Sequence, residues 1–208
     1  MPAAAGASRD FPTKDEEPRP ESHYPDIDRL VVERRVGPEQ NWSERKQLVL
    51  PLLTRSVEEL RERQKADGTS LGLIKPREIL DFTIEPCEQS TWTPEEMAKL
   101  QQQNLFQQGP ARRLEKIPFE LRYQFVCDDP RCQGHSLRIW DWEVAESYRN
   151  WRSRYRTPDE LQDAMVKKYL DEMREKRDTH FFMGTMAAHP QTWTIIGLFY
   201  PMKESTHR

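Results

Sequence analysis

Apolar and polar residues alternate along the middle of the chain in two runs that lie close together. From residue 119 to residue 127 every second side chain is apolar, and the alternation returns over residues 135–139. A period of two is typical of a strand with one buried face. The connection between the runs contains Asp-Asp-Pro and Gly134, which favour a turn. The pattern therefore predicts a β-hairpin with Cys127 and His135 at the two strand ends.

Other segments carry the signals of helix starts and of further strands. A serine or threonine followed three residues later by glutamate forms a capping box, and the pairs are Ser56–Glu59, Thr93–Glu96 and Thr157–Glu160. Helices are expected over residues 141–155 and 157–176, and strands over residues 71–74 and 79–84. The run 192–200 is apolar on both faces, which predicts a central, covered strand. Together these elements predict an α+β protein with a mixed or antiparallel sheet and flanking helices.

Composition divides the chain into four parts. Residues 1–25 are rich in Ala, Pro, Glu and Ser, which predicts a disordered N-terminal leader. A polar linker at residues 101–116 separates an N-terminal α+β part, residues 26–100, from a C-terminal α+β part, residues 117–203. The formal net charge of −3 gives no overall attraction to nucleic acid or to an anionic membrane. Because the sequence shows neither a spanning segment nor a signal peptide, we expect a cytoplasmic protein without a membrane partner.

The predicted hairpin gathers three side chains that can bind metal. Cys127, Cys132 and His135 offer two thiolates and an imidazole, which are ligands that suit zinc. A fourth ligand is needed, and the candidates are Cys87, His180, His189, Asp128 and Asp129. In the alternative interpretation, Cys127 is a small buried apolar residue and His135 a hydrogen-bonded turn residue.

The same region is the densest in acidic groups. Asp128 and Asp129 lie in the turn, and Asp141 and Glu143 follow the second strand. A metal-dependent nuclease or other hydrolase could hold a divalent ion with these four carboxylates and use His135 as the base. Alternatively, Asp141 caps the next helix and Glu143 lies in its first turn, where the helix dipole favours acidic residues. No other enzyme motif is present in the sequence.

A segment of interleaved arginines and aromatic residues follows. Arg149, Arg152 and Arg156 would share one face of a helix that starts at Asp141, and Trp151 and Tyr155 lie among them. Arginines pair with phosphates and aromatic rings stack on bases, so this segment suggests binding of DNA or RNA. In the alternative interpretation, the aromatic stripe packs on the sheet and the arginines are solvated.

The chain resembles a family of uncharacterised bacterial proteins over about residues 25–203. The resemblance is carried by SLGLIKPREILDF, LEKIPF, CDDPRCQGH with DWE, DTHFFMG and WTIIGLFYP. It implies a bacterial cytoplasmic protein of the kind found near defence or nucleotide-modification genes. Together with the arginine segment, it suggests a nucleic-acid-binding or accessory protein of a bacterial defence or DNA-processing system. A metal-dependent hydrolase and a purely structural protein-interaction subunit are the alternatives.

Overall fold

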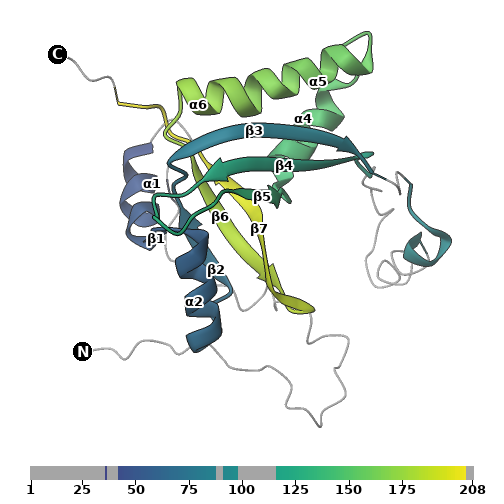
Figure 1. Ribbon diagram of the computed structural model, residues 1–208. Helices are drawn as coiled ribbons and strands as arrows, with labels where there is room; N and C mark the ends of the chain where they lie inside the picture. The colour runs from purple at the N-terminus through teal and green to yellow at the C-terminus, as the bar shows by residue number, and fades with distance from the viewer. Residues whose placement is uncertain (1–35, 37–41, 88–90, 98–115, 205–208) are drawn as a thin grey trace. The chain divides into compact units, whose positions relative to one another are not determined.

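Two small sheets and their covering helices make up the described part of the chain, which comprises residue 36 and residues 42–87, 91–97 and 116–204 of a computed structural model. In chain order the elements are α1 (Trp42–Val49), the 3-10 turn η3 (Leu50–Leu52), β1 (Leu53–Thr54), α2 (Val57–Asp67), β2 (Leu71–Ile74), β3 (Glu78–Pro86), β4 (Phe119–Val126), β5 (His135–Arg138), α4 (Trp142–Trp151), α5 (Pro158–Val166), η5 (Lys167–Glu172), α6 (Met173–Glu175), β6 (His180–Met186) and β7 (His189–Phe199). All of them belong to one unit, Trp42–Arg208 (Figure 1). The predicted α+β class is confirmed.

The strands form a four-stranded mixed sheet in the order β1-β2-β6-β7 and a three-stranded antiparallel sheet in the order β3-β4-β5. Just beyond β5, Ile139 forms a parallel bridge with Ile195 of β7. The Trp140 N–H donates to the Ile195 carbonyl at 2.7 Å, and the Thr194 hydroxyl donates to the Arg138 carbonyl at 2.6 Å. The two sheets are therefore joined edge to edge at this point.

The central hairpin forms as the alternation predicts. β4 and β5 pair in an antiparallel register that places Phe125 opposite His135. On β4, Leu121, Tyr123 and Phe125 are buried, and the residues between them are only partly covered. Cys127 continues the buried face beyond the strand end. The hairpin thus points its apolar face inward and carries its loop at the end where Cys127 lies.

The expectation of a central final strand is wrong over most of β7. This strand is the last in its sheet, and it pairs along its length with β6 only. Its second edge meets the other sheet at the Ile139 bridge alone. Ile195 is fully buried, whereas its neighbour Ile196 is 42% exposed. The double-sided apolar pattern reflects the junction of the two sheets rather than a position inside one sheet.

Helix starts follow the predicted caps. Ser56, Thr93 and Thr157 each accept a hydrogen bond from the backbone of the glutamate three residues later. Gly68 ends α2 in the left-handed conformation, with φ of 78°. The helix expected over residues 141–155 stops earlier, because α4 ends at Trp151. Thr157 precedes a proline, which disfavours helical geometry there, so one helix cannot run through this position.

The helical run α5–η5–α6 lies alongside the three-stranded sheet (Figure 1). Its middle is a π-helical segment that buries Tyr169 and Leu170. The Tyr169 ring packs against the Phe82 ring of β3, with the ring centres 5.6 Å apart. The Tyr123 hydroxyl of β4 donates a hydrogen bond to the Tyr169 carbonyl. Tyr123 in turn stacks on Phe181 of β6 at 4.9 Å. This aromatic chain links the helices, the three-stranded sheet and the four-stranded sheet in one core.

Helix α2 lies directly on strand β2. A Cβ atom added to Gly72 would overlap Leu60 Cδ2 and lie 3.0 Å from Leu60 Cδ1, so only glycine permits this approach. Val57 and Leu60 are fully buried or nearly so. The position of α2, and of the side chains at its start, is therefore fixed by the four-stranded sheet.

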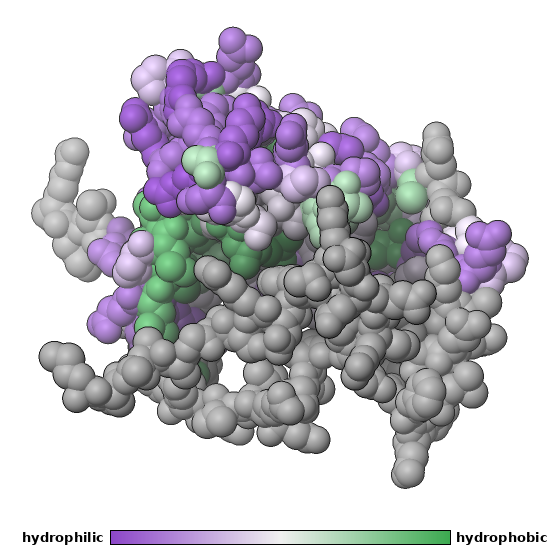
Figure 2. All heavy atoms as spheres, turned by 90° about the horizontal axis from the view of Figure 1, so that it is seen from below, coloured by the Kyte–Doolittle hydropathy of each residue, from purple (hydrophilic) through white to green (hydrophobic). Residues whose placement is uncertain are grey.

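Segments from both predicted α+β parts pair with each other. β2 pairs with β6, and β3 pairs with β4, so each sheet contains strands from both sides of residues 101–116. The expected linker lies outside the described residues except for residue 116, and so does the expected leader, residues 1–25. No helix among the described residues has the length and apolar character needed to cross a membrane. The face drawn in Figure 2 shows hydrophobic surface beside hydrophilic surface. Among the described residues, the exposed apolar side chains include Leu52 and Leu71.

Candidate metal centre

The loop between β4 and β5 is docked against the start of helix α2. Ser56, the N-cap of α2, donates its hydroxyl to Asp129 Oδ2 at 2.9 Å. Asp129 also accepts hydrogen bonds from the Arg131 backbone N–H at 3.0 Å and from the Arg131 guanidinium. Arg131 also forms an ion pair with Glu62 of α2. The loop is therefore held by charged hydrogen bonds, which are roughly twice as strong as neutral ones.

Four donor groups from these two elements meet in one place. Glu58 of α2, Cys127, Cys132 and His135 each offer one ligand atom, and these atoms all lie within 4.8 Å of one another. His135 Nε2 lies 3.0 Å from Glu58 Oε1 and 3.4 Å from Cys132 Sγ. In a tetrahedral zinc site, metal–ligand bonds of 2.0–2.3 Å place neighbouring ligand atoms about 3.3–3.8 Å apart. To surround an ion, the closest pair of donor atoms would move slightly apart and the more distant ones closer together.

The geometry favours a metal site over a catalytic relay. In a relay of cysteine, histidine and carboxylate, the carboxylate orients the imidazole through one ring nitrogen while the thiol meets the other. Here Glu58 and Cys132 both approach the same nitrogen, Nε2 of His135. Donors that converge on one point suit a shared ion rather than a proton passed along a line.

Burial affects the donors in different ways. It raises the pKa of the Cys127 thiol to about 12, so a bound ion would have to displace the thiol proton. It also lowers the pKa of His135, against the opposing effect of Glu58, so the imidazole is neutral and able to coordinate at neutral pH. Among the described residues, Glu58 Oε2 is one of three buried side-chain oxygen or nitrogen atoms without a hydrogen-bond partner. Buried polar atoms are normally satisfied, so an unpartnered carboxylate oxygen beside two thiols indicates a place for a cation.

The hydrogen bonds around the donors orient them. The Cys127 backbone N–H donates to Cys132 Sγ at 3.1 Å, which stabilises negative charge on that sulfur. The His135 ring packs against Phe125 at 5.2 Å between ring centroids. The donor set can therefore hold a metal ion, and its two sulfurs favour a soft or borderline ion over magnesium or calcium.

Glu58 was not among the fourth ligands suggested by the sequence. His180 is 2% exposed, and its Nδ1 contacts the Asp178 carbonyl at 2.9 Å. Asp129 is held by Ser56 and Arg131, whereas Asp128 is exposed. None of Cys87, His180, His189, Asp128 and Asp129 belongs to the cluster. The capping box correctly placed a helix start at Ser56, but nothing in the local sequence indicated which loop would dock on it.

The four acidic residues considered for a hydrolase do not converge. Asp141 caps α4 by accepting from the Val144 N–H at 3.0 Å, and its other oxygen accepts from the Leu198 N–H at 2.9 Å. Burial raises the pKa of Asp141, partly offset by these backbone donors. Glu143 accepts a hydrogen bond from the Tyr200 hydroxyl at 3.0 Å. Of the residues proposed for that mechanism, only His135 lies in the cluster of donors.

The predicted arginine stripe is not formed on one helix. Arg149 is on α4, but its side chain is 17% exposed and pairs with Glu146 at 2.6 Å. Arg152 caps the helix end, and Arg156 lies beyond it, where its backbone N–H donates to Glu160. Trp151 packs against the core, while Tyr155 is 38% exposed. The prediction of a continuous basic helix face over residues 149–156 is therefore wrong.

An exposed pair of aromatic side chains lies next to this segment and was not singled out from the sequence. Trp140 and Trp142 are 52% and 56% exposed. The Arg138 guanidinium lies 4.2 Å from the centre of the Trp140 ring, and that of Arg149 lies 5.5 Å from the Trp142 ring. The available signal was the run in which every second residue, Arg138, Trp140 and Trp142, is arginine or tryptophan.

Comparison with known proteins identifies a family but no activity. A family model described as a domain of unknown function (DUF8757) matches residues 53–208. No curated protein and no solved structure matches the chain. The matched region contains the whole donor cluster and both sheets.

Proposed function

The chain belongs to the DUF8757 family, and we propose that it is a zinc-binding protein in which the metal has a structural role. The observation that carries this proposal is the convergence of Glu58, Cys127, Cys132 and His135. Four protein ligands complete a tetrahedral shell and leave no position for water, as in structural rather than catalytic zinc sites. The ion would cross-link helix α2 to the hairpin loop.

The energetic consequence follows from the location of the ligands. Three of them lie on one hairpin, and Glu58 comes from a helix that is distant in sequence. In the unfolded chain this set does not exist as a preformed site, so metal-binding free energy becomes folding free energy. Binding also requires removal of the Cys127 proton, whose pKa is raised by burial, so affinity increases as pH rises.

Metal analysis of the purified protein tests the proposal. We expect about one zinc per chain, which is the stoichiometry of a single tetrahedral site. Cys132→Ser and Glu58→Gln should each reduce zinc content and lower the melting temperature. Cys87→Ser is the matched control, because Cys87 lies outside the cluster, and it should retain zinc.

Two results would contradict the structural metal. One is wild-type protein that contains no zinc after purification and gains no thermal stability when zinc is added. The other is equal zinc content in the Cys132→Ser and Cys87→Ser proteins. Activity that depends on added magnesium or manganese would instead favour the hydrolase alternative.

A second candidate function is binding of single-stranded DNA or RNA, as an accessory protein of a bacterial defence or DNA-processing system. The observation that favours it is the exposed pair Trp140 and Trp142, each with an arginine over its ring. Exposed aromatic rings stack on the bases of single strands, whereas the two arginines are paired with Glu120 and Glu146. We call Trp140 and Trp142 the tryptophan surface, and we propose it as the nucleic-acid contact in place of the arginine stripe expected from the sequence.

Fluorescence anisotropy with a labelled oligothymidylate tests this second function. Trp142→Ala should weaken binding by about 1–3 kcal/mol, which is the contribution of one stacked base. Trp92→Ala is the control, because Trp92 is a partly exposed tryptophan on a different segment, and it should leave affinity unchanged. Absence of binding at low salt, or equal loss from both variants, would exclude the tryptophan surface.

A further inference from the structure

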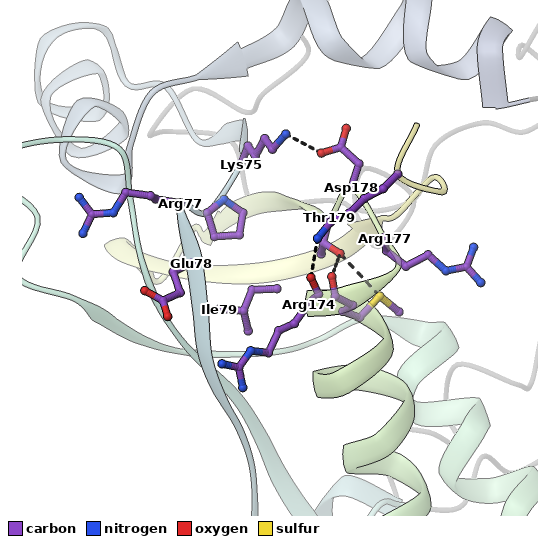
Figure 3. A pocket seen from close by; sticks show the side chains of 11 residues that line it. Lys75, Arg77, Glu78, Ile79, Arg174, Arg177, Asp178 and Thr179 are labelled. Carbon is purple, nitrogen blue, oxygen red and sulfur yellow. Dashed lines mark hydrogen bonds and ion pairs between the residues drawn. The ribbon is translucent and has the colours of Figure 1, made fainter. Parts of the chain in front are cut away.

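A pocket at the end of the helical run collects basic side chains from three separate segments. Its volume is about 270 Å³, and it is lined by the β2–β3 connection, the end of the α5–α6 run, the start of β6 and the residues after β7 (Figure 3). The lining side chains with charge are Lys75, Arg77, Glu78, Arg174, Arg177, Asp178 and Lys203. Five of these seven are basic, in a chain whose formal net charge is −3. We call this the basic pocket.

The base of the basic pocket is apolar and fixed. Ile79 and Met173 are 5% and 1% exposed. The Thr179 hydroxyl donates to the Met173 carbonyl at 2.9 Å, so it satisfies one of the free carbonyls at the helix end. Lys203 Nζ donates to the Arg174 carbonyl at 2.6 Å and satisfies a second one. These contacts offset the partial negative charge that the helix end would otherwise direct at the cavity.

Ion pairs neutralise only part of the basic charge. Lys75 pairs with Asp178 at 2.5 Å, and Figure 3 shows the two side chains turned toward each other. Arg177 pairs with Glu172, outside the pocket. Within the described residues, no carboxylate forms an ion pair with Arg77, Arg174 or Lys203. Of the two lining carboxylates, Asp178 is paired with Lys75, and Glu78 forms no ion pair among the described residues. The unpaired lining side chains therefore carry more positive than negative charge.

The helix dipole explains only some of these residues. Basic side chains are favoured near a helix C-terminus, which accounts for Arg174 and Lys203. Arg77 comes from the β2–β3 connection, where its backbone N–H donates to the Val126 carbonyl at 2.8 Å, and Figure 3 shows its side chain extending away from that of Arg174. Like charges gathered around one cavity repel each other, and an anion bound among them would relieve that repulsion.

We propose that the basic pocket binds a phosphomonoester group, with Arg77 and Arg174 as its main ligands and Lys203 as a further contact. Guanidinium groups match phosphate oxygens with paired hydrogen bonds, and an ammonium adds a point charge. A cavity of about 270 Å³ lies just below the range of about 300–1,000 Å³ occupied by drug-sized ligands, so it suits a phosphate and one sugar. The group can belong to a sugar phosphate or to the 5′ end of a nucleic-acid strand. None of these residues belongs to the metal cluster or to the tryptophan surface.

Calorimetric titration of the full chain with ribose 5-phosphate tests the site at constant ionic strength. We expect saturable binding that Arg77→Gln and Arg174→Gln each weaken by about tenfold or more, as loss of a charged hydrogen bond implies. Both side chains are exposed, so the folded state should tolerate these changes. Lys203→Gln is a second variant that keeps the test informative if either arginine variant fails to fold. Arg63→Gln, an exposed arginine on α2, is the control and should bind as the wild type does.

A pair of oligonucleotides distinguishes the two sources of the phosphate. A decamer with a 5′-phosphate should bind more tightly than the same decamer with a 5′-hydroxyl if the pocket accepts strand ends, and Arg174→Gln should abolish the difference. Binding of ribose 5-phosphate without that difference assigns the site to small molecules. The proposal is overturned if ribose 5-phosphate shows no saturable binding, or if Arg63→Gln weakens it as much as Arg77→Gln and Arg174→Gln.

Discussion

The docking of the hairpin loop on α2 can be tested at Ser56, which is fully buried. Its hydroxyl has two roles: it accepts from the Glu59 N–H at 3.1 Å as the helix cap, and it donates to Asp129 at 2.9 Å. Ser56→Ala removes both hydrogen bonds. Loss of an N-cap costs about 1 kcal/mol, and loss of a hydrogen bond to a charged group costs about 1.5–3 kcal/mol. We therefore expect Ser56→Ala to reduce the free energy of unfolding by about 3 kcal/mol.

Thr157→Ala is the matched control for the cap alone. Thr157 caps α5 with the same geometry, but it is exposed and has no second side-chain partner beyond its capping box. This change should reduce the free energy of unfolding by about 1 kcal/mol. Urea unfolding followed by tryptophan fluorescence measures both values. An unchanged slope of unfolding free energy against urea concentration would show that the unfolded state is unaffected.

A double-mutant cycle with Asp129→Ala isolates the contact between Ser56 and Asp129, because alanine has no group that can accept from the serine hydroxyl. In the Asp129→Ala background Ser56→Ala should cost only what the lost cap costs, about 1 kcal/mol. Asp128→Ala controls for the substitution itself, because Asp128 is adjacent and exposed. If Ser56→Ala costs no more than Thr157→Ala, or if the cycle is additive, the loop is not docked through Ser56.

Two further predictions test the packing of α2 and the protonation of a buried histidine. Gly72→Ala should reduce the free energy of unfolding by about 1–3 kcal/mol, because the added methyl group overlaps buried Leu60. Gly184→Ala is the control and should cost less, since Ile196 beside it is 42% exposed and can move. Equal losses of stability in urea unfolding would refute the close approach of α2 to β2 at Gly72. Burial lowers the pKa of His180 below its unfolded value, so its contribution to stability is complete above about pH 6.5 and is lost as pH falls through the lower folded pKa. His180→Gln should flatten the dependence of unfolding free energy on pH below about 6.5, and an unchanged dependence would contradict the shift.

The sequence predicted those features whose causes are local. The capping boxes at Ser56 and Thr157 depend on residues within one helical turn, and the alternation in β4 depends on neighbours in one strand. Cys127, Cys132 and His135 could be associated for the same reason, because a single tight turn brings them together. In each case the interaction that fixes the structure spans a few residues and is visible as a spacing.

Features that depend on distant contacts were missed or misplaced. Glu58 has no local sign of a ligand, and it becomes one only because α2 lies on β2 at Gly72. The apolar pattern of β7 could not distinguish an internal strand from a strand at the junction of two sheets. The arginine stripe assumed a helix over residues 141–155, but α4 ends at Trp151. The basic pocket combines four segments, so no single spacing could reveal it.

Two of the connections between the sheets differ in kind, and the candidate metal cluster lies at one of them. At one, the Ile139–Ile195 bridge joins the sheet edges by backbone hydrogen bonds, which no ligand controls. At the other, α2 is packed on the four-stranded sheet and bonded to the loop of the three-stranded sheet through the donor cluster and Asp129. Because the second connection contains two thiols, a buried imidazole and an unpartnered carboxylate oxygen, we expect its strength to depend on whether an ion is bound. Removing the metal should therefore increase hydrogen exchange in α2 and the 127–134 loop while the strand pairs of β3–β4 and β6–β7 remain protected.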